Sequence, residues 1–559
     1  MKKVLIALLA FPLASLCNAI MIPSGRVANP LLFAQSMAPN PFKARVDPNA
    51  PVTYRNPVIP GFYSDPSVVR VGEDYYLVTS TFEYFPGIPV FHSRDLVHWE
   101  QIGHAIDRPD QLPQGMNVFA CTLRYHDGTF YIINTNVGRG GNFFVTATDP
   151  AGPWSDPIWV KMGGIDPDLF FDDDGKVYTI GSTFNLFEID PKTGELLTEG
   201  RKIWASTGGR YPEGPHIYKK DGWYYLMAAE GGTEEAHSET IARSNNIWGP
   251  YYSNPANPIL THANAAGQQN PIQGVGHADM VQAPEGSWWI VFHGYRTVIP
   301  GGFHHTLGRE TCLAPVSWPE YGWPQVNGNG TVTVEMRVPT LPLYPFPQRP
   351  ARVDFNEKLG LEWDYVQIPE VDRYSVEARP GFLRLKGSAL TLGSRDGSPT
   401  FVGRRLQDMD FTSTSRLEFD PSRENEEAGI VLLNNGTHFD LLIRRSGGKR
   451  VLVARLQFES VTYESDEIAL APGPVDLRVQ GARSVFRFSY SQGGGEFKDV
   501  QEVSARYLSS ETIGGFTGTY VGLYETGNGQ PSATDADYDW FEYVANEPQS
   551  GGRPSRGVN

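Results

Sequence analysis

The chain has 559 residues, a formal net charge of −16 and 20% charged residues. This length is too great for a single core, so we expect two domains with extensions. The negative charge disfavours a nucleic acid partner, because binding phosphates requires a basic surface. Aromatic residues make up 12%, with 59 Gly and 44 Pro. The composition predicts an all-β fold of short strands joined by turns and argues against helical bundles.

Residues 1–19 have the pattern of a signal peptide. Lys2 and Lys3 precede an apolar run over residues 4–16 and a small-residue cleavage site that ends at Ala19. This run is too short to span a membrane, and no later stretch is long enough. We therefore expect a secreted protein, extracellular or periplasmic, without a membrane span. Residues 20–50 are rich in Pro, Ala and Asn and are expected to form a loosely ordered extension.

A repeating unit occupies residues 51–338. Each unit has a small or acidic residue that opens a strand, then a turn with glycine, then an aromatic strand. The second aromatic residue of each unit is Tyr76, Tyr131, Tyr178, Tyr225 or Trp289. Spacing of roughly 40–50 residues per unit is typical of propeller blades, so five units predict a five-bladed β-propeller.

Four polar residues fall at the same place in this repeat. Asp65 lies 11 residues before Tyr76, and Asp166, Glu213 and His277 each lie 12 residues before the aromatic residue of their own unit. In the second unit the position falls on Phe119 or Ala120. The innermost strands of a propeller line its axis, so we expect these residues to meet at one end of the central channel.

The pattern changes after the propeller. Residues 339–350 are proline-rich and are expected to form an extended linker. Residues 351–545 alternate strand-like runs with turn signals and show no helical period, which predicts an antiparallel β-sandwich. Residues 546–559 are expected to be a disordered tail.

Several of these residues also have simple structural interpretations. Asp65 and Asp166 each precede a proline and can cap turns. Asp168 is an alternative candidate for the site position of Asp166, because it lies two residues later on the same strand face. Glutamate is a poor turn residue, so Glu213 is harder to explain structurally. His277 can merely form a hydrogen bond inside the channel or contact a divalent cation through water, for which a lone histidine is weak evidence.

The side chains of Phe82 and Phe119 fit either a core or a wall on which a sugar stacks. Arg309 can pair with Glu310 or with an acid in the core, and arginine suits a site with three carboxylates because it stays charged. The acidic run at residues 172–174 lacks the ligand spacing of a calcium loop and is expected to be a hairpin turn. Of the cysteines after residue 19, Cys121 and Cys312, we expect both to be free buried thiols.

Two carboxyl groups across an axial pocket, with a third nearby, suit cleavage of a glycosidic bond. Crowded like charges raise the pKa of one group, which can then donate a proton to the leaving oxygen. We assign Glu213 as this general acid and Asp65 as the general base that activates water. Asp166 is expected to orient Glu213 and to modulate its pKa.

The motifs around these residues resemble glycoside hydrolase family 43. They are Gly-Phe-Tyr-Ser-Asp-Pro-Ser around Asp65, Gly-Ile-Asp-Pro around Asp166, Tyr-Pro-Glu-Gly-Pro-His around Glu213, Gly-His-Ala-Asp around His277 and Leu-Gly-Arg-Glu-Thr around Arg309. The likeness spans residues 54–545 and is greatest to β-xylosidases and α-L-arabinofuranosidases with a C-terminal β-sandwich.

The resemblance implies a five-bladed propeller and an inverting mechanism with the three roles given above. It also implies that Arg309 contacts the terminal sugar, that Phe82 helps to wall the pocket, and that His277 organises a central water or cation. No cofactor is required, although a structural or activating divalent cation near His277 is compatible with the pattern.

Two departures concern the substrate. The family's xylosidases often have Trp-Ala-Pro where this chain has Phe119, Ala120 and Cys121, and Pro where it has Ser64. The first changes a wall of the pocket, so the preference between xylose and arabinose stays open. In relatives a sandwich loop closes the pocket, for which residues 516–520 are the candidate here. A closed pocket would make the enzyme exo-acting.

The leading hypothesis is an exo-acting hydrolase that removes terminal xylose or arabinofuranose from xylan or arabinoxylan oligosaccharides. An arabinan- or galactan-cleaving relative is a second enzyme hypothesis. A secreted sugar-binding propeller without catalysis is the hypothesis of another class, and the intact set of three acids argues against it.

Overall fold

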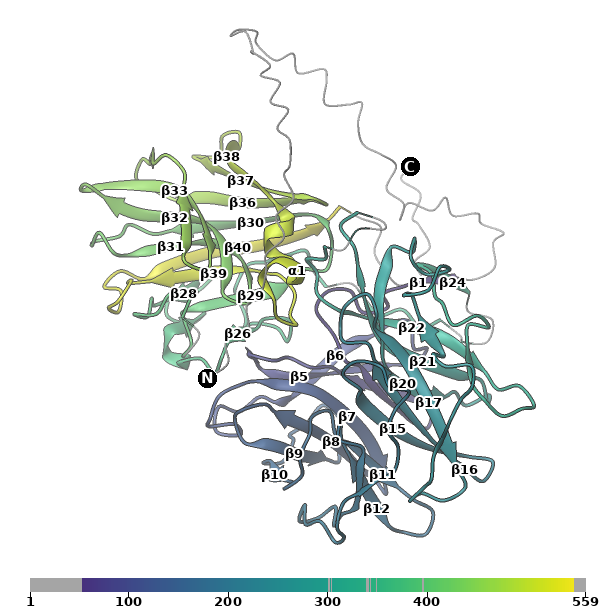
Figure 1. The fold of residues 1–559 in the computed structure, drawn as a ribbon. Coiled ribbons are helices and arrows are strands. Elements are labelled where there is room, and N and C mark those ends of the chain that lie inside the picture. The colour runs from purple at the N-terminus through teal and green to yellow at the C-terminus, as the bar shows by residue number, and fades with distance from the viewer. Residues whose placement is uncertain are drawn as a thin grey trace, which may run out of the picture. The chain divides into compact units, whose positions relative to one another are not determined.

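The computed structural model describes residues 53–546, apart from residues 300, 301, 303, 338–340, 342, 348, 395 and 396. Within this part, all elements are strands except one short helix and two 3-10 turns, α1 (Ser510–Ile513), η2 (Val371–Arg373) and η3 (Ala505–Leu508) (Figure 1). The predicted signal peptide and N-terminal extension lie outside the described residues, as does the tail except Asn546.

Twenty strands form five four-stranded antiparallel sheets, to one of which β19 (Leu260–Thr261) adds. In the first two, the strands are β2 (Ser67–Val71), β3 (Asp74–Val78), β5 (Gly87–Ser93) and β6 (Glu100–Ile106), then β7 (Val118–His126), β8 (Thr129–Asn136), β9 (Gly141–Ala147) and β10 (Ile158–Trp159). The third contains β11 (Asp168–Phe171), β12 (Val177–Ile180), β13 (Asn185–Glu188) and β14 (Arg201–Lys202). The last two contain β15 (Glu213–Lys220), β16 (Trp223–Glu230), β17 (Ser238–Ser244) and β18 (Tyr252–Ser253), then β20 (Ile272–Gln282), β21 (Trp288–Arg296), β22 (Glu310–Ser317) and β23 (Gln325–Val326).

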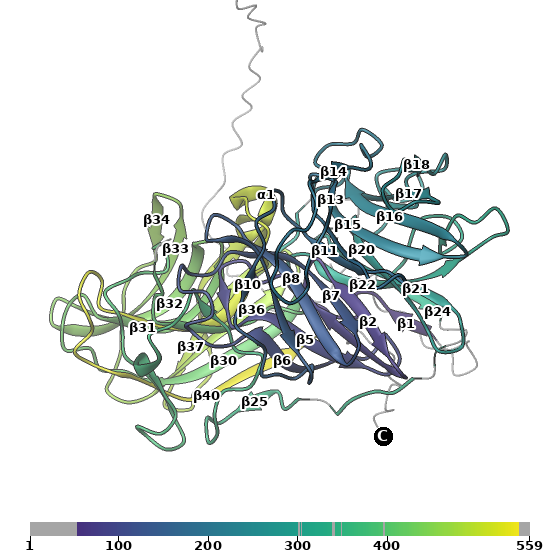
Figure 2. The same cartoon turned by 90° about the horizontal axis from the view of Figure 1, so that it is seen from below.

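The first strand of each sheet faces the axis. Contacts run from β2 to β7, β11, β15 and β20 and back to β2, so the five sheets close into a ring. The predicted five-bladed propeller is therefore confirmed. Figure 2 shows these sheets from a second direction.

A short pair of strands joins the two ends of the propeller segment. β1 (Thr53–Arg55) pairs with β24 (Glu335–Arg337). After β1 the chain runs alongside β22. There the backbone N–H of Val58 donates to the carbonyl of Thr311 over 2.8 Å. The chain then turns inward to Asp65, so this closure also fixes the start of the first inner strand.

The C-terminal part is a β-sandwich, as predicted. One sheet contains β25 (Arg352–Val353), β27 (Tyr374–Ser375), β28 (Leu383–Leu385), β30 (Asp410–Glu418), β36 (Val475–Ala482), β37 (Val485–Gln492), β38 (Lys498–Ser504) and β40 (Ala536–Ala545). The other contains β29 (Phe401–Arg405), β31 (Glu427–Asn434), β32 (Thr437–Ser446), β33 (Lys449–Phe458), β34 (Val461–Glu464), β35 (Ile468–Ala469) and β39 (Tyr520–Thr526). Alternate residues of the strands, such as Val475, Leu477 and Val479 of β36, form the buried core. Their period of two matches the side-chain alternation of strands.

The sandwich and the propeller lie in one compact unit and contact each other at two places that matter for the site. β26 (Tyr365–Val366) pairs with β4 (Tyr84–Phe85), a short strand inserted into the first blade. Residues 514–519 form a strap, in which the backbone N–H of Thr519 donates to the carbonyl of Thr306 over 2.9 Å. The strap therefore rests on the segment that precedes Arg309.

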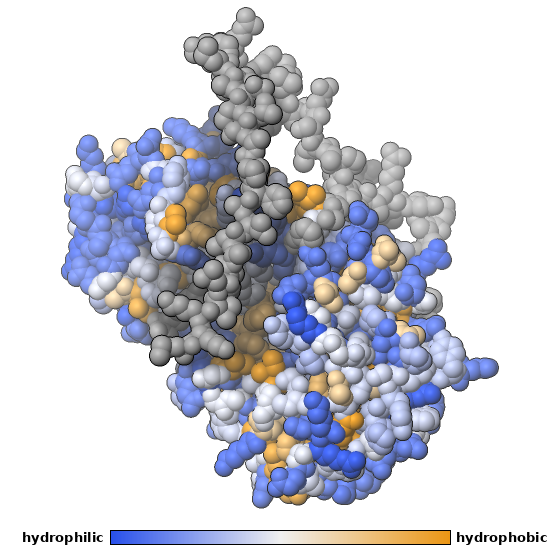
Figure 3. Space-filling view, viewed as in Figure 1, coloured by the Kyte–Doolittle hydropathy of each residue, from blue (hydrophilic) through white to orange (hydrophobic). Residues whose placement is uncertain are grey.

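The face shown in Figure 3 is mainly hydrophilic, with smaller hydrophobic patches. No helix within the described ranges is both long and apolar enough to cross a bilayer.

Candidate active site

A cavity of about 80 Å³ lies at the ends of the inner strands. It brings together seven residues selected from the sequence, Asp65, Phe82, Phe119, Asp166, Glu213, His277 and Arg309. Ala120, Ile165, Thr233 and Phe516 complete its lining. Asp65, Asp166, Glu213 and His277, up to 212 positions apart in the chain, thus surround one small space, as the repeat geometry predicted.

An unusual backbone conformation positions three of the polar residues. Asp65, Asp166 and His277 have φ values of 55°, 53° and 50°. Each lies two residues before the point where its inner strand takes up regular pairing with the next strand. Left-handed backbone is unfavourable for residues other than glycine and often occurs at functional sites.

The strand register corrects one part of the sequence alignment. In the fourth blade the equivalent position is Gly214, with a φ of 55°, and not Glu213. A Cβ atom on Gly214 would lie 2.8 Å from Nε2 of His277, so a side chain has no room there. Glu213 lies one residue earlier, beside a bulge in the pairing of β15 with β16. In the second blade the position falls on Ala120, four residues before the partner of Tyr131, just as Asp65 lies four residues before the partner of Tyr76.

The Asp65 carboxylate is buried and receives several hydrogen bonds. Its Oδ1 lies 2.6 Å from Nη1 of Arg309 and 3.0 Å from Nδ1 of His293. Its Oδ2 accepts from the hydroxyls of Ser80 over 2.5 Å and of Ser64 over 3.0 Å. Burial by itself would raise the pKa of Asp65, but the Arg309 charge and the His293 hydrogen bond hold that pKa well below its usual range.

The other two carboxyl groups respond in the opposite direction. Burial, together with the charge of Asp65, raises the pKa of Glu213 to about 7. Burial and the charges of Glu213 and Asp65 raise the pKa of Asp166 well above its usual value. The cavity therefore combines one carboxylate that stays ionised with a coupled pair of carboxyls that keeps a proton near neutral pH.

Arg309 is the buried cation of the site. Its partner is Asp65 and not the adjacent Glu310, which forms a two-bond pair with Arg296 over 2.8 Å for each bond. Nη2 of Arg309 also donates to the carbonyl of Phe516 over 3.4 Å. The arginine thus links a propeller acid to the sandwich strap.

Three aromatic rings form one wall of the cavity. The ring centroid of Phe82 lies 4.8 Å from that of Phe119 and 5.6 Å from that of Phe516. Phe516, in the strap, is 42% exposed. Phe82 and Phe119 therefore line the cavity rather than a remote core, and the sandwich contributes the third ring.

His277 belongs to a group of buried imidazoles under the acids. Its Nδ1 lies 3.7 Å from Oδ1 of Asp65, and its ring is tilted against that of His293 at 5.7 Å. Burial lowers the pKa of His277 to about 3 and that of His293 to about 4, so both rings are neutral. Ligand atoms of Asp65, His277 and His293 lie within 4.8 Å of one another. The cation near His277 stays a prediction, and the Arg309 guanidinium already neutralises the carboxylate of this group.

Some residues of the site had no usable signal in the sequence. His293 lies in the middle of β21, within an otherwise apolar run, and Ser80 follows β3. Neither belongs to a repeated motif. Thr233 comes from the loop between β16 and β17. Their positions become evident only when strands from different blades are brought together.

Other candidates prove to be structural. Asp168 forms an ion pair with Arg124 at 2.8 Å and lies outside the cavity lining, so it does not compete with Asp166 for the site. Residues 172–174 form the turn between β11 and β12, as expected. Cys121 and Cys312 are buried and unpaired, also as expected.

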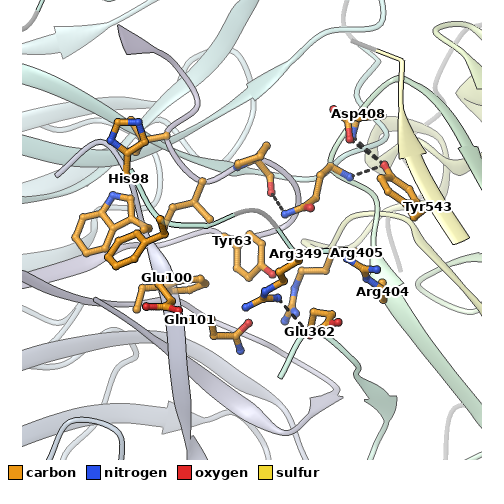
Figure 4. Close-up of a pocket in the computed structure, with 18 of the residues that line it drawn as sticks. Tyr63, His98, Glu100, Gln101, Arg349, Glu362, Arg404, Arg405, Asp408 and Tyr543 are labelled. Carbon is orange, nitrogen blue, oxygen red and sulfur yellow. Dashed lines mark hydrogen bonds and ion pairs between the residues drawn. The ribbon is translucent and has the colours of Figure 1, made fainter. Parts of the chain in front are cut away.

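A larger cavity, of about 510 Å³, is lined by residues of the propeller, the linker and the sandwich (Figure 4). Its charged residues include an ion pair between Arg349 and Glu362 at 3.3 Å. None of the three acids Asp65, Asp166 and Glu213 lines it. It therefore lacks the combination of acid and base found in the small cavity.

Comparisons with known proteins agree with this architecture. The model of the glycosyl hydrolases family 43 matches residues 54–324. The model of the beta xylosidase C-terminal Concanavalin A-like domain matches residues 352–544.

Similar proteins cover nearly the same region. A non-reducing end alpha-L-arabinofuranosidase from Bacteroides ovatus is 45% identical over 88% of this chain and 94% of its own length. A xylosidase/arabinosidase from Butyrivibrio fibrisolvens is 38% identical over 88% of this chain and 99% of its own. A solved structure described as Bacteroides ovatus Xyloglucan PUL GH43B has a TM-score of 0.84 and 44% identity, covering 88% of this chain and 100% of that one.

Proposed function

Because the chain belongs to the glycosyl hydrolases of family 43, we propose that it removes single pentose units from the non-reducing ends of oligosaccharides. The units are α-L-arabinofuranose or β-D-xylose, and the oligosaccharides are those of xylan or arabinoxylan. The observation that carries the proposal is the small cavity that holds Asp65, Asp166, Glu213 and Arg309 together.

The three acids take the roles expected for inversion. Asp65, held ionised by Arg309, accepts a proton from a water molecule as the water oxygen attacks the anomeric carbon. Glu213 donates its proton to the glycosidic oxygen as the bond to that carbon breaks. The charges of Asp166 and Glu213 interact, and Asp166 accepts a hydrogen bond from the backbone of Gly214, the residue after Glu213. Their coupling keeps a proton available near neutral pH.

The dimensions of the cavity support exo-action. Pockets for larger ligands have volumes of roughly 300–1,000 Å³, whereas this cavity has about 80 Å³. The strap closes one side through Phe516. A cavity of this kind accommodates one terminal sugar and no continuing chain.

The remaining lining residues bind the terminal sugar in this proposal. Arg309 donates to its hydroxyls, and the rings of Phe82 and Phe119 cover its apolar face. His277 presents a neutral ring to the bottom of the cavity. The reaction itself uses carboxyl groups and water and needs no cofactor.

The names of the relatives support pentoses as the sugars removed. They name an arabinofuranosidase and a xylosidase/arabinosidase. Neither the hypothesis of an arabinan- or galactan-cleaving relative nor the non-catalytic hypothesis gains support from them. The name of one solved relative contains the word xyloglucan, so xyloglucan oligosaccharides are tested as substrates beside those of arabinoxylan. The apolar segment over residues 4–16 supports a secreted location.

Hydrolysis of three nitrophenyl glycosides tests the proposal. We expect release of nitrophenol from α-L-arabinofuranoside, β-D-xyloside or both, and little from β-D-galactoside. Arabinoxylan and xyloglucan oligosaccharides, analysed for the sugar released, identify the glycan. Activity on galactoside alone, or on none of the three, would contradict the proposal.

A further inference from the structure

One exposed aromatic residue lies immediately before the proposed acid. The side chain of Tyr211 is 66% exposed, two residues before Glu213. Its φ of 50° is left-handed, which is unfavourable for a bulky residue. Strained backbone that presents a side chain to solvent is a feature that functional sites often retain.

The Tyr211 ring is held in place by its neighbours. The Arg210 guanidinium lies 5.2 Å from the ring centroid, and its Nη2 donates to the carbonyl of Gly231 over 3.2 Å. Arg210 also pairs with Glu234. A Cβ atom on Gly232 would lie 2.9 Å from Nη2 of Arg210 and 3.4 Å from Cδ2 of Tyr211. The ring therefore lies against the loop at Gly232.

This group lies on the acid's side of the cavity. Thr233, between Gly232 and Glu234, is part of the cavity lining. Glu234 pairs with Arg210, three residues before Glu213, and its charge adds to the effects of burial and of Asp65, which raise the pKa of Glu213. We call Arg210, Tyr211 and Glu234 the acid-side rim.

Cleavage of the glycosidic bond requires the leaving group to lie at this rim. The acid protonates the oxygen that links the terminal sugar to the leaving group. When the terminal sugar fills the small cavity, the next sugar unit has to emerge beside Glu213. An exposed ring offers an apolar face for a sugar's C–H groups, and a guanidinium and a carboxylate offer donors and acceptors for its hydroxyls.

We infer that the acid-side rim binds the first sugar of the leaving group, which stacks on Tyr211 and forms hydrogen bonds with Arg210 and Glu234. The inference rests on the proposed function, because it locates the leaving group of that reaction. It makes the enzyme selective for a sugar, rather than a small alcohol, as the leaving group.

Paired substrates test this inference. Each pair shares the terminal pentose: xylobiose with β-D-xylosyl fluoride, and an arabinofuranosyl xylo-oligosaccharide with α-L-arabinofuranosyl fluoride. Fluoride carries no ring to stack. For Tyr211→Ala we expect the ratio of kcat/KM on the oligosaccharide to that on the fluoride to fall about tenfold. Tyr211→Asn tolerates left-handed backbone and should give the same fall, whereas Tyr211→Phe keeps the ring and should keep most of the ratio.

Tyr252→Ala is the matched control. Tyr252 is also 66% exposed and lies in β18 of the same blade, outside the cavity lining. Its replacement should leave the ratio unchanged. If Tyr211→Ala and Tyr211→Asn keep the wild-type ratio, the inference is wrong while the proposed function stands. A wild-type protein that hydrolyses neither pair would overturn both.

Discussion

Nη1 of Arg309 lies 2.6 Å from Oδ1 of Asp65, which sets a permanent charge against the carboxylate that activates water in the proposed mechanism. Arg309 comes from the segment just before β22 and also contacts the sandwich strap. The ionisation of the base is therefore set by a residue that both domains hold in place.

Replacing the base should reduce turnover strongly. For Asp65→Asn we expect kcat to fall about 10²–10⁴-fold, because the amide cannot accept the proton from water. The variant leaves Arg309 buried without its anion, so its thermal unfolding is measured alongside the kinetics. Asp173→Asn, in the exposed turn between β11 and β12, serves as the control and should match wild type. A folded Asp65→Asn protein with wild-type kcat would contradict the assignment.

Replacing the acid should have an effect that depends on the leaving group. Glu213→Gln cannot donate a proton, so oligosaccharides, which need one, should lose at least about 10²-fold in kcat. A dinitrophenyl glycoside leaves without protonation and should lose far less. The measurement is kcat for both substrate types with the same terminal pentose. Equal losses on both would show that Glu213 is not the proton donor.

The pH dependence follows from the two carboxyls. Glu213 must be protonated, so activity should decline as pH rises through its pKa of about 7. Asp65 must be ionised, so activity should decline on the acid side only as pH falls through its lowered pKa, below the usual value for aspartate. The profile of kcat/KM for the free enzyme measures both limbs.

A variant near the acid tests the cause of the alkaline limb. Burial and the Asp65 charge raise the pKa of Glu213 most, and the Glu234 charge adds a smaller increase, so Glu234→Gln should move this limb slightly to lower pH. The Glu234 side chain is 64% exposed, so high salt should screen the same effect in wild type. Glu235→Gln, at the adjacent exposed position, should leave the limb in place. A limb that does not move in Glu234→Gln would contradict this source of the shift.

The strap should determine affinity for the terminal sugar. A Cβ atom on Gly518 would lie 2.3 Å from the carbonyl oxygen of Leu307, so Gly518→Ala must displace the strap from its seat. We expect KM to rise about tenfold, since Phe516 would move from the cavity wall. Gly393→Ala is the control, because its Cβ would meet nothing within 4 Å. Unchanged KM in Gly518→Ala would show that the strap does not shape the site.

The sequence predicts the blades well because every hairpin carries the same turn and aromatic pattern. It misplaces Glu213 by one residue because the hairpins differ in length. The β11–β12 turn runs from Asp172 to Lys176, whereas β15 and β16 are joined by Asp221 and Gly222 alone. Counting back 12 residues from Tyr178 and Tyr225 therefore reaches different positions on the inner strands.

Contacts between distant segments could not be predicted in the same way. The sequence offered two alternative partners for Arg309, namely Glu310 or a core acid. Only the packing of the segment before β22 against Asp65 decides between them. His293 reaches Asp65 from the fifth blade, and its position within an apolar strand resembles that of an ordinary core residue. Such pairings depend on ring closure, which no local pattern contains.

The stereochemistry of hydrolysis tests the central claim most directly, because it distinguishes Asp65 as a base that activates water from Asp65 as a nucleophile. Proton NMR, recorded within the first minutes of hydrolysis, identifies the anomer of the pentose that is released before it equilibrates. The account predicts the inverted anomer, β-L-arabinofuranose from an α-L-arabinofuranoside or α-D-xylose from a β-D-xyloside. First release of the retained anomer would contradict it.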